Sequence, residues 1–394
     1  PQEPGTPTGF QPINTGTTGG GSGGTGSAAT TSGGVSVGNR PLKIPSLRLL
    51  SGTPVGGYGA STTASTTNIL WIDRGRGNVY QASSDSLNIT TLSNTVVPRI
   101  FESVWNKNLT SFMASLFEDG DLTPATVYTE LIRKPSRTSS TTPASPDASS
   151  APYELRGKNI AGNIIGYAAS PDKSRLFTLL DENGSGVGYI SAFNASNPTR
   201  LFTTPLTQLN VSWPSDNVIA ITTKGSANYG GFLYFVNPGT GAWSKILGPL
   251  PGLSARVNDT GKYVLYSSTG KNNDILTGIY SVTAGTTTDA IVRTLADKCA
   301  WGNFYKELAY CGVPTRLVPG RYPDDWYLGT LSTVDKIWQV NAVTGEVKLV
   351  SSLIDQADRI LNVFNLETDP KDKYLFFMNK NDLSLWSLDL VKPN

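Results

Sequence analysis

The chain has 394 residues and a formal net charge of +2, and only 16% of its residues are charged. It contains no histidine, which excludes Ser-His-Asp and Cys-His nucleophilic sites and every metal site that depends on imidazole ligands. The small net charge gives no broad field for nucleic acid, and no apolar run is long enough to cross a bilayer. We therefore expect no nucleic-acid partner, and membrane contact only through an anchor that is not part of this sequence.

The first 40 residues form a region of their own, rich in Pro, Thr and Gly, with a run of Gly and Ser at positions 19–24. Such a composition cannot bury enough apolar surface to offset the loss of chain entropy on folding. We predict a flexible or partner-bound tail over residues 1–40 and a folded region over 41–394. A second low-complexity stretch, which begins at Ser136, predicts an exposed insertion near 136–160.

A short pattern recurs along the folded region: a small or aliphatic residue followed by an aromatic residue. Successive aromatics are 45 to 48 residues apart, except for two intervals of 61 and 58 that contain insertions. A repeat of about 45 residues is typical of a four-stranded propeller blade. The seven pairs are Val79-Tyr80, Val127-Tyr128, Gly188-Tyr189, Leu233-Tyr234, Ile279-Tyr280, Ile337-Trp338 and Leu385-Trp386.

A turn that leads into an apolar strand precedes most of these aromatics. It is seen at 170–173 (SPDK), 257–261 (VNDTG) and 368–371 (TDPK). Asn, Asp, Pro and Gly favour tight turns, and the apolar runs that follow are typical of buried strands. Each repeat is thus predicted to run as strand, turn, apolar strand, loop, aromatic strand, turn and outer strand.

The two ends of the folded region each contain part of one blade. After Trp386 the chain has no room for an outer strand, whereas residues 46–51 form a spare strand before the first full repeat. Pairing the two ends within one blade would remove an exposed sheet edge. The sequence therefore predicts an all-β fold, a seven-bladed β-propeller closed by its N-terminal strand.

Cys299 and Cys311 bracket a segment that reads as strand, turn, strand. In a hairpin centred near Tyr305 the two cysteines stand opposite each other. Cross-strand Cβ atoms lie about 4.5–5.5 Å apart, close to the roughly 3.5–4.5 Å that a disulfide requires. We predict a disulfide, with two buried free thiols as the alternative, and a disulfide implies export to an oxidising compartment.

The turns at 170–173 and 258–263 resemble those of WD40-like and TolB-type propeller repeats, and the resemblance covers most of residues 46–390. The Gly-His and Trp-Asp signatures of true WD40 repeats are absent. The chain also resembles uncharacterised surface propellers of candidate-phylum bacteria, in its long linker and in the segments 68–73 (NILWID) and 322–327 (YPDDWY). That resemblance implies a secreted or membrane-tethered protein and supplies no catalytic residue.

The insertion at 313–329 is the strongest candidate for a binding site, because aromatic rings stack on sugars or peptides while polar groups fix their orientation. The alternative is a loop that folds onto its own blade and covers one mouth of the channel. The candidate ligand-binding residues are Arg321, Tyr322, Asp324, Asp325, Trp326 and Tyr327, with Arg316 in the same loop.

Metal binding and catalysis receive little support from the acidic residues. The clusters at 118–121 and 181–185 offer closely spaced oxygen atoms, but neither matches the twelve-residue calcium loop, so we expect solvated turns. Glycosidase chemistry needs two carboxylates across a cleft, and 30 acidic residues do not single out a pair. We expect no enzymatic activity, no metal and no cofactor.

Two functions fit these features. In the first, which we favour, the chain is an extracellular structural protein whose tail joins it to copies of itself or to another surface protein, as a filament or surface layer. Donation of a strand to an exposed sheet edge is one way to build such an assembly. In the second, the tail is a spacer, and the propeller loops of a surface-tethered binding module recognise a glycan or a protein.

Overall fold

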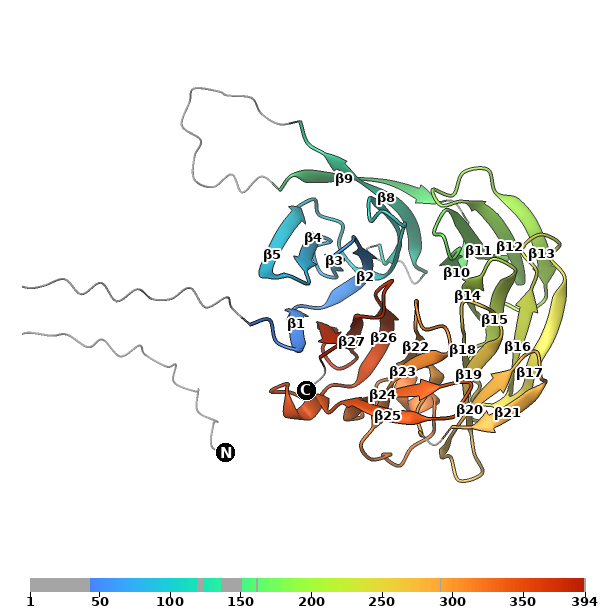
Figure 1. Ribbon diagram of the computed structural model, residues 1–394. Helices are drawn as coiled ribbons and strands as arrows, with labels where there is room; N and C mark the ends of the chain where they lie inside the picture. The colour runs from blue at the N-terminus through green and yellow to red at the C-terminus, as the bar shows by residue number, and fades with distance from the viewer. Residues whose placement is uncertain (1–42, 119–122, 136–150, 161, 291, 393–394) are drawn as a thin grey trace, which may run out of the picture. The chain divides into compact units, whose positions relative to one another are not determined.

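The computed structural model describes residues 43–118, 123–135, 151–160, 162–290 and 292–392. The predicted tail and most of the insertion near 136–160 lie outside these residues. The chain divides into two units, Pro1–Lys43 and Ile44–Asn394, and the description below concerns the second. Its strands follow one another in groups of four, coloured from blue to red in Figure 1.

Within the described residues the fold is all-β, with one α-helical turn, α1 (Asp324–Tyr327), and two short 3-10 segments, η1 (Ala296–Lys298) and η2 (Leu353–Asp355). The first three groups of strands are β2 (Val55–Thr62), β3 (Thr67–Asp73), β4 (Val79–Ser83) and β5 (Ser86–Ser93); β6 (Ile100–Trp105), β7 (Ser111–Leu116), β8 (Ala125–Arg133) and β9 (Tyr153–Ile160); β10 (Ile164–Ala169), β11 (Arg175–Glu182), β12 (Ser185–Ala192) and β13 (Thr199–Thr204). The other four are β14 (Leu209–Ser215), β15 (Val218–Thr223), β16 (Gly230–Val236) and β17 (Trp243–Pro251); β18 (Ser254–Val257), β19 (Tyr263–Thr269), β20 (Ile275–Ser281) and β21 (Thr286–Asp289); β22 (Cys299–Trp301), β23 (Leu308–Pro314), β24 (Asp335–Asn341) and β25 (Val347–Ser351); and β26 (Val363–Thr368), β27 (Tyr374–Asn379) and β28 (Leu385–Asp389), which β1 (Leu47–Ser51) completes.

Neighbouring strands within each group pair antiparallel and in chain order. The first two groups are connected through one parallel residue pair, Ser93 with Tyr153, so that they form one eight-stranded sheet. The remaining groups are separate four-stranded sheets. This series of four-stranded antiparallel units is consistent with a β-propeller.

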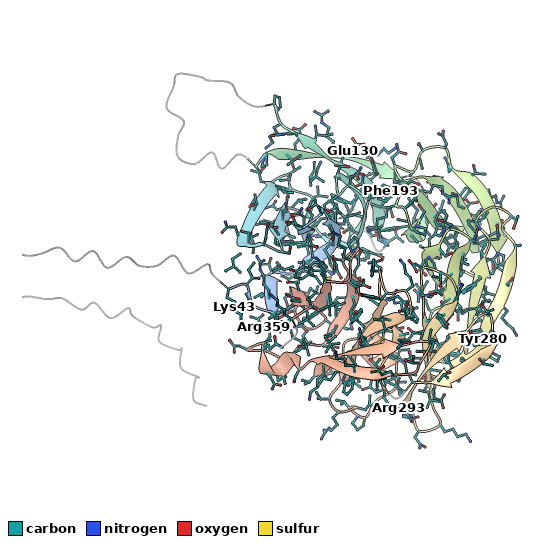
Figure 2. The ribbon with its side chains drawn as sticks, in the orientation of Figure 1. Lys43, Glu130, Phe193, Tyr280, Arg293 and Arg359 are labelled. Carbon is teal, nitrogen blue, oxygen red and sulfur yellow. A yellow bond between two sulfur atoms is a disulfide. The ribbon has the colours of Figure 1, made fainter. Side chains whose placement is uncertain are left out.

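The recurring aromatics mark one position in the fold. All seven lie on the third strand of their group: β4, β8, β12, β16, β20, β24 and β28. Tyr280, on β20, is labelled in Figure 2. Aromatic contacts also connect neighbouring groups: Phe193, after β12, packs edge-on against Tyr128 of β8 with 6.4 Å between ring centroids. The repeat that the sequence predicts is thus a repeat of strand position.

The recurring turns between the first and second strands share one hydrogen-bonding pattern, in which a side-chain oxygen accepts backbone N–H groups. Asn258 Oδ1 accepts the backbone N–H groups of Lys262 and Tyr263 at 3.0 and 3.1 Å. Asp369 Oδ1 does the same with the amides four and five residues later. Asn106 and Ser170 occupy the same turn in their groups. A side-chain oxygen that replaces a backbone acceptor explains why Asn, Asp and Ser recur between the first and second strands.

The predicted spare strand is β1, which pairs antiparallel with β28, Leu47 opposite Leu388. In Figure 1 the blue strand β1 lies beside the red strands of that sheet. Leu50 packs in one apolar cluster with Trp71 of the first group and Phe376 of the last. The strand before the first group therefore belongs to the last sheet.

The predicted disulfide is present. Cys299 and Cys311 stand opposite each other on β22 and β23, with 4.1 Å between their Cα atoms. Both side chains are buried. A disulfide is typical of oxidising compartments. No helix among the described residues is long and apolar enough to span a membrane.

Candidate functional site

The first strand of every group is a sheet edge, and most of these edges line hollow space. Three cavities, of about 620, 440 and 520 Å³, are lined mainly by β2, β6, β10, β14, β18 and β26. We call them together the edge-strand cavity. Glu102 of β6 is the residue that lines all three. Because edge strands leave backbone N–H and C=O groups unpaired, these walls offer donors and acceptors to a polar occupant.

Glu102 owes its position to a β-bulge. The register of β6 against β7 shifts between Ile100 and Glu102. Strands β2 and β10 carry a bulge at the equivalent position. The residue that follows the bulge is Gly57 on β2 and Gly166 on β10. A Cβ on Gly57 would collide with Ser103, and one on Gly166 would lie 3.1 Å from a Val211 methyl group. Bulges re-aim side chains, and glycine at these two positions allows Ser103 and Val211 to approach the backbones of β2 and β10 closely.

The Glu102 side chain is exposed to the cavity and forms no hydrogen bond or ion pair with any other described residue. The surrounding walls nevertheless limit its hydration, and this desolvation raises the pKa of its carboxyl group. The hydroxyl of Tyr167 donates to the backbone carbonyl of Glu102 at 3.4 Å, so the carboxylate is left without a protein partner.

Asp297 is the second acidic group in the walls, and it is fully engaged. Its Oδ2 accepts hydrogen bonds from the hydroxyls of Tyr327, at 2.6 Å, and Ser254, at 2.7 Å. Its Oδ1 lies 3.7 Å from the guanidinium of Arg256. Burial, together with the neighbouring Asp297, raises the pKa of Tyr327, so this phenol stays protonated and keeps donating.

Further charged residues line the cavity beside the turns between the first and second strands. Lys173 lies 3.5 Å from Glu367, and Lys306 pairs with Asp259. Three cations in the walls, Arg256, Lys173 and Lys306, are thus each paired with a carboxylate. The Glu102 carboxylate, in contrast, is paired with no cation among the described residues.

The loop at 313–329 reaches this cavity through Tyr327, which lines two of its three parts, and through Trp326, which lines one. Trp326 and Tyr322 are largely buried in an apolar cluster with Leu295 and Leu331. The indole N–H of Trp326 donates to Asn362 at 2.9 Å. The two rings therefore pack against the protein in this structure.

The other predicted ligand-binding residues have partners within the protein. Asp324 accepts the backbone N–H of Ala227 at 2.7 Å and the hydroxyl of Ser226 at 3.0 Å, which connects the loop to the fourth group rather than to its own blade. Asp325 pairs with Arg321 at 3.2 Å, and Arg316 lines a separate cavity. The loop brings Tyr327 and Trp326 to the edge-strand cavity, and its other predicted ligand-binding residues are not among the residues that line it.

A buried polar network around Lys298 supports the loop at 313–329. The ammonium of Lys298 lies 2.7 Å from Asp335 and donates to Thr333 at 2.6 Å and Asn362 at 2.9 Å. Asn362 is also the acceptor for Trp326. Burial lowers the pKa of Lys298, while Asp335 opposes that shift. This network contacts Trp326 through Asn362 and Lys298 and so fixes the position of its ring.

Sequence reasoning did not single out Glu102, Arg256 or Asp297. One signal was available in the sequence. Glycine follows the bulge in the first strand of groups one and three, at Gly57 and Gly166, whereas group two has Glu102 at that position. At the acidic cluster 181–185, Asp181 accepts the backbone N–H of Gly184 at 2.8 Å, which is the predicted turn. Of the cluster 118–121, only the first residue is described.

Comparison with known proteins gives structural likenesses without a family. No family model matches the chain, and no curated protein matches it in sequence. Similar solved structures include TolB from Acinetobacter baumannii (11% identity, TM-score 0.43), a puromycin-hydrolysing peptidase of Mycobacterium tuberculosis (13%, 0.46) and an oligogalacturonate lyase in complex with manganese (11%, 0.48). The alignments cover 82%, 82% and 86% of this chain, and 63%, 50% and 98% of those chains. The chain thus spans less than two thirds of TolB and half of the peptidase.

Proposed function

We propose that residues 44–392 form a seven-bladed β-propeller closed by β1, and that this propeller is an exported, non-catalytic binding module. The seven third-strand aromatics and the completion of the last sheet by β1 support the blade count and the closure. The contact of the Tyr58 hydroxyl with the Asn365 and Phe376 carbonyls, between the first and last groups, supports a closed ring. The disulfide supports export to an oxidising compartment.

The observation that carries the binding role is the edge-strand cavity itself. Its largest part, about 620 Å³, lies within the usual range of ligand pockets, roughly 300–1,000 Å³. Its walls combine unpaired strand edges, fixed ion pairs and tyrosine rings, which suit a polar ligand such as a glycan or a peptide segment of a protein. Tyr327 narrows the cavity on the side of the 313–329 loop.

A non-catalytic role fits the state of the carboxylates that line the cavity better than hydrolysis does, because Asp259 and Glu367 are paired with lysines. A pair of carboxylates can hydrolyse glycosides only when the second is free to attack or to activate water. Asp297 is held by Arg256, Ser254 and Tyr327, so it is not free for that task. The chain also offers no histidine as a general base.

A cavity-filling variant tests this proposal. Ser212 of β14 lines two parts of the cavity, and Ser212→Trp should fill it. Ser244→Trp, on the exposed outer strand β17, is the matched control. We expect a glycan or peptide found on arrays to bind the parent protein and Ser244→Trp equally and to lose binding to Ser212→Trp. Equal binding to all three proteins would place the ligand elsewhere and refute the proposal.

Self-assembly through residues 1–40 is the other function that the sequence suggests, and it stays a prediction, because the tail lies outside the described residues. Electron microscopy of the protein with and without residues 1–40 tests it directly. Filaments that disappear on deletion would support assembly. Monodisperse particles in both preparations would exclude it and leave the tail as a spacer.

A further inference from the structure

One carboxylate of the edge-strand cavity, that of Glu102, forms no ion pair with any described residue. Glu102 lines all three parts, whereas Arg256, Lys173 and Lys306 are each paired with another carboxylate. Two further cations of the walls, Lys224 and Arg74, lie outside the strands. Five cations and four carboxylates thus line the cavity, and Glu102 is the carboxylate that none of these cations pairs with.

Leaving that carboxylate unpaired costs free energy, because the walls limit its hydration. The equivalent positions on the strands to either side are Gly57 and Gly166, so neither neighbouring strand supplies a side chain to pair with it. A carboxylate with limited hydration gains most from an incoming cation, because the interaction is strengthened where water is excluded. A charged ligand group would reach Glu102 through the cavity parts that this residue lines.

We infer that Glu102 is the subsite for a primary ammonium group, the side chain of a lysine on a partner protein; this inference rests on the proposed binding role. The wall next to Glu102 is apolar at Ile165 and Val211, which suits the methylene stem of a lysine. Tyr167 and Tyr327 line the same part, and tyrosine rings attract cations. Amino sugars carry the same ammonium on a polar ring that such a wall suits less well.

Small probes separate charge from shape. Nα-acetyl-lysine N-methylamide has the ammonium, Nα-acetyl-norleucine N-methylamide has the stem alone, and glucosamine has the ammonium on a sugar. Calorimetry or ligand-observed NMR on the full chain gives the dissociation constants. We expect the lysine probe to bind at least about tenfold tighter than the norleucine probe, a difference that corresponds to one charge-assisted contact.

Variants identify the carboxylate responsible. Glu102→Gln keeps the shape of the side chain and should abolish the preference for lysine, whereas Glu346→Gln, an exposed glutamate outside the cavity, should retain it. Binding should also weaken as the pH falls through the raised pKa of Glu102, because protonation removes its charge. The other ionisable groups that line the cavity are Tyr58, Arg74, Tyr167, Lys173, Lys224, Arg256, Asp259, Asp297, Lys306, Tyr327 and Glu367.

Several results would overturn the inference. Equal affinity for the lysine and norleucine probes, or no binding of either, would show that charge is not recognised. A lysine preference that survives in Glu102→Gln would assign it to another group. Tighter binding of glucosamine, lost in Glu102→Gln, would make the partner an amino sugar. If the lysine preference is absent while Ser212→Trp still blocks a ligand found on the arrays, this subsite is refuted and the proposed function stands.

Discussion

Lys298→Met is the most informative perturbation of the fold, because it removes one half of a buried ion pair. The side chains of Lys298 and Asp335 are 1% and 0% exposed, with 2.7 Å between ammonium and carboxylate. After the substitution, Asp335 keeps one bond, from the backbone N–H of Val363 at 2.6 Å. Its Oδ1 has no hydrogen-bond partner among the described residues. A buried carboxylate would thus stand without a counter-charge.

The expected loss follows from that geometry. Removing one partner of a buried pair costs about 3–5 kcal/mol, and the lost contact of the ammonium with the Trp326 ring adds about 0.5–1 kcal/mol. Lys298→Met with Asp335→Asn should recover most of this loss, since no charge is then left buried. The midpoint of urea unfolding, followed by tryptophan fluorescence, measures both. Lys245→Met, at an exposed position on β17, is the control.

The dependence on pH gives a second check. In Lys298→Met the unpaired carboxylate has a folded-state pKa above its unfolded value. The loss of stability should therefore be complete above the folded pKa and disappear below the unfolded value, about 3.9. A loss below about 1 kcal/mol at pH 7.5 would contradict the reasoning, given the expected 3–5 kcal/mol. A double variant no more stable than Lys298→Met would also contradict it.

Three further predictions concern the cavity, the disulfide and a turn. Glu102→Gln should raise the melting temperature at pH 7.5 and leave it unchanged near pH 4, because the penalty for ionised Glu102 is absent below its unfolded-state pKa, about 4.3, and is complete above its raised folded-state pKa; equal effects at both pH values would contradict this. Replacing Cys299 and Cys311 by serine opens a loop with a sequence separation of 12 and should cost about 3 kcal/mol, seen as a lower urea midpoint that reductant no longer changes. Asp372 accepts the backbone N–H groups of residues 303–305 at 2.7, 3.0 and 2.8 Å. Asp372→Asn should cost about 1.5–3 kcal/mol and speed hydrogen exchange at those amides, and unchanged exchange would sink the idea.

Features set by local sequence were accessible without the structure. Asn258 and Asp369 bond to amides four and five residues later, so their turns depend on a few consecutive residues. The Cys299–Cys311 bridge depends on one hairpin. The spacing of the aromatics likewise reflects a repeat whose members occupy one strand position.

The candidate site was not accessible, because it depends on neighbours that are distant in sequence. Glu102 has no motif around it, and it is distinguished by glycines more than 40 residues away on either side. Trp326 has the composition of a ligand-binding residue, but its environment is made by Asn362 and Lys298. Residue type suggested stacking on a ligand, whereas the Trp326 ring is buried against these neighbours, so ligand binding by this residue stays a prediction.

The pairing of β1 with β28 also sets the order in which the molecule can be completed. Leu47 is among the first residues of the folded unit to be synthesised, and its partner Leu388 is among the last. Contacts across such a separation form late, because a long chain segment must be ordered first. Until then β1 is an unpaired strand with two buried-type leucines, exposed to aggregation. In a chain that crosses a membrane unfolded, β1 would stay unpaired until β28 has also crossed.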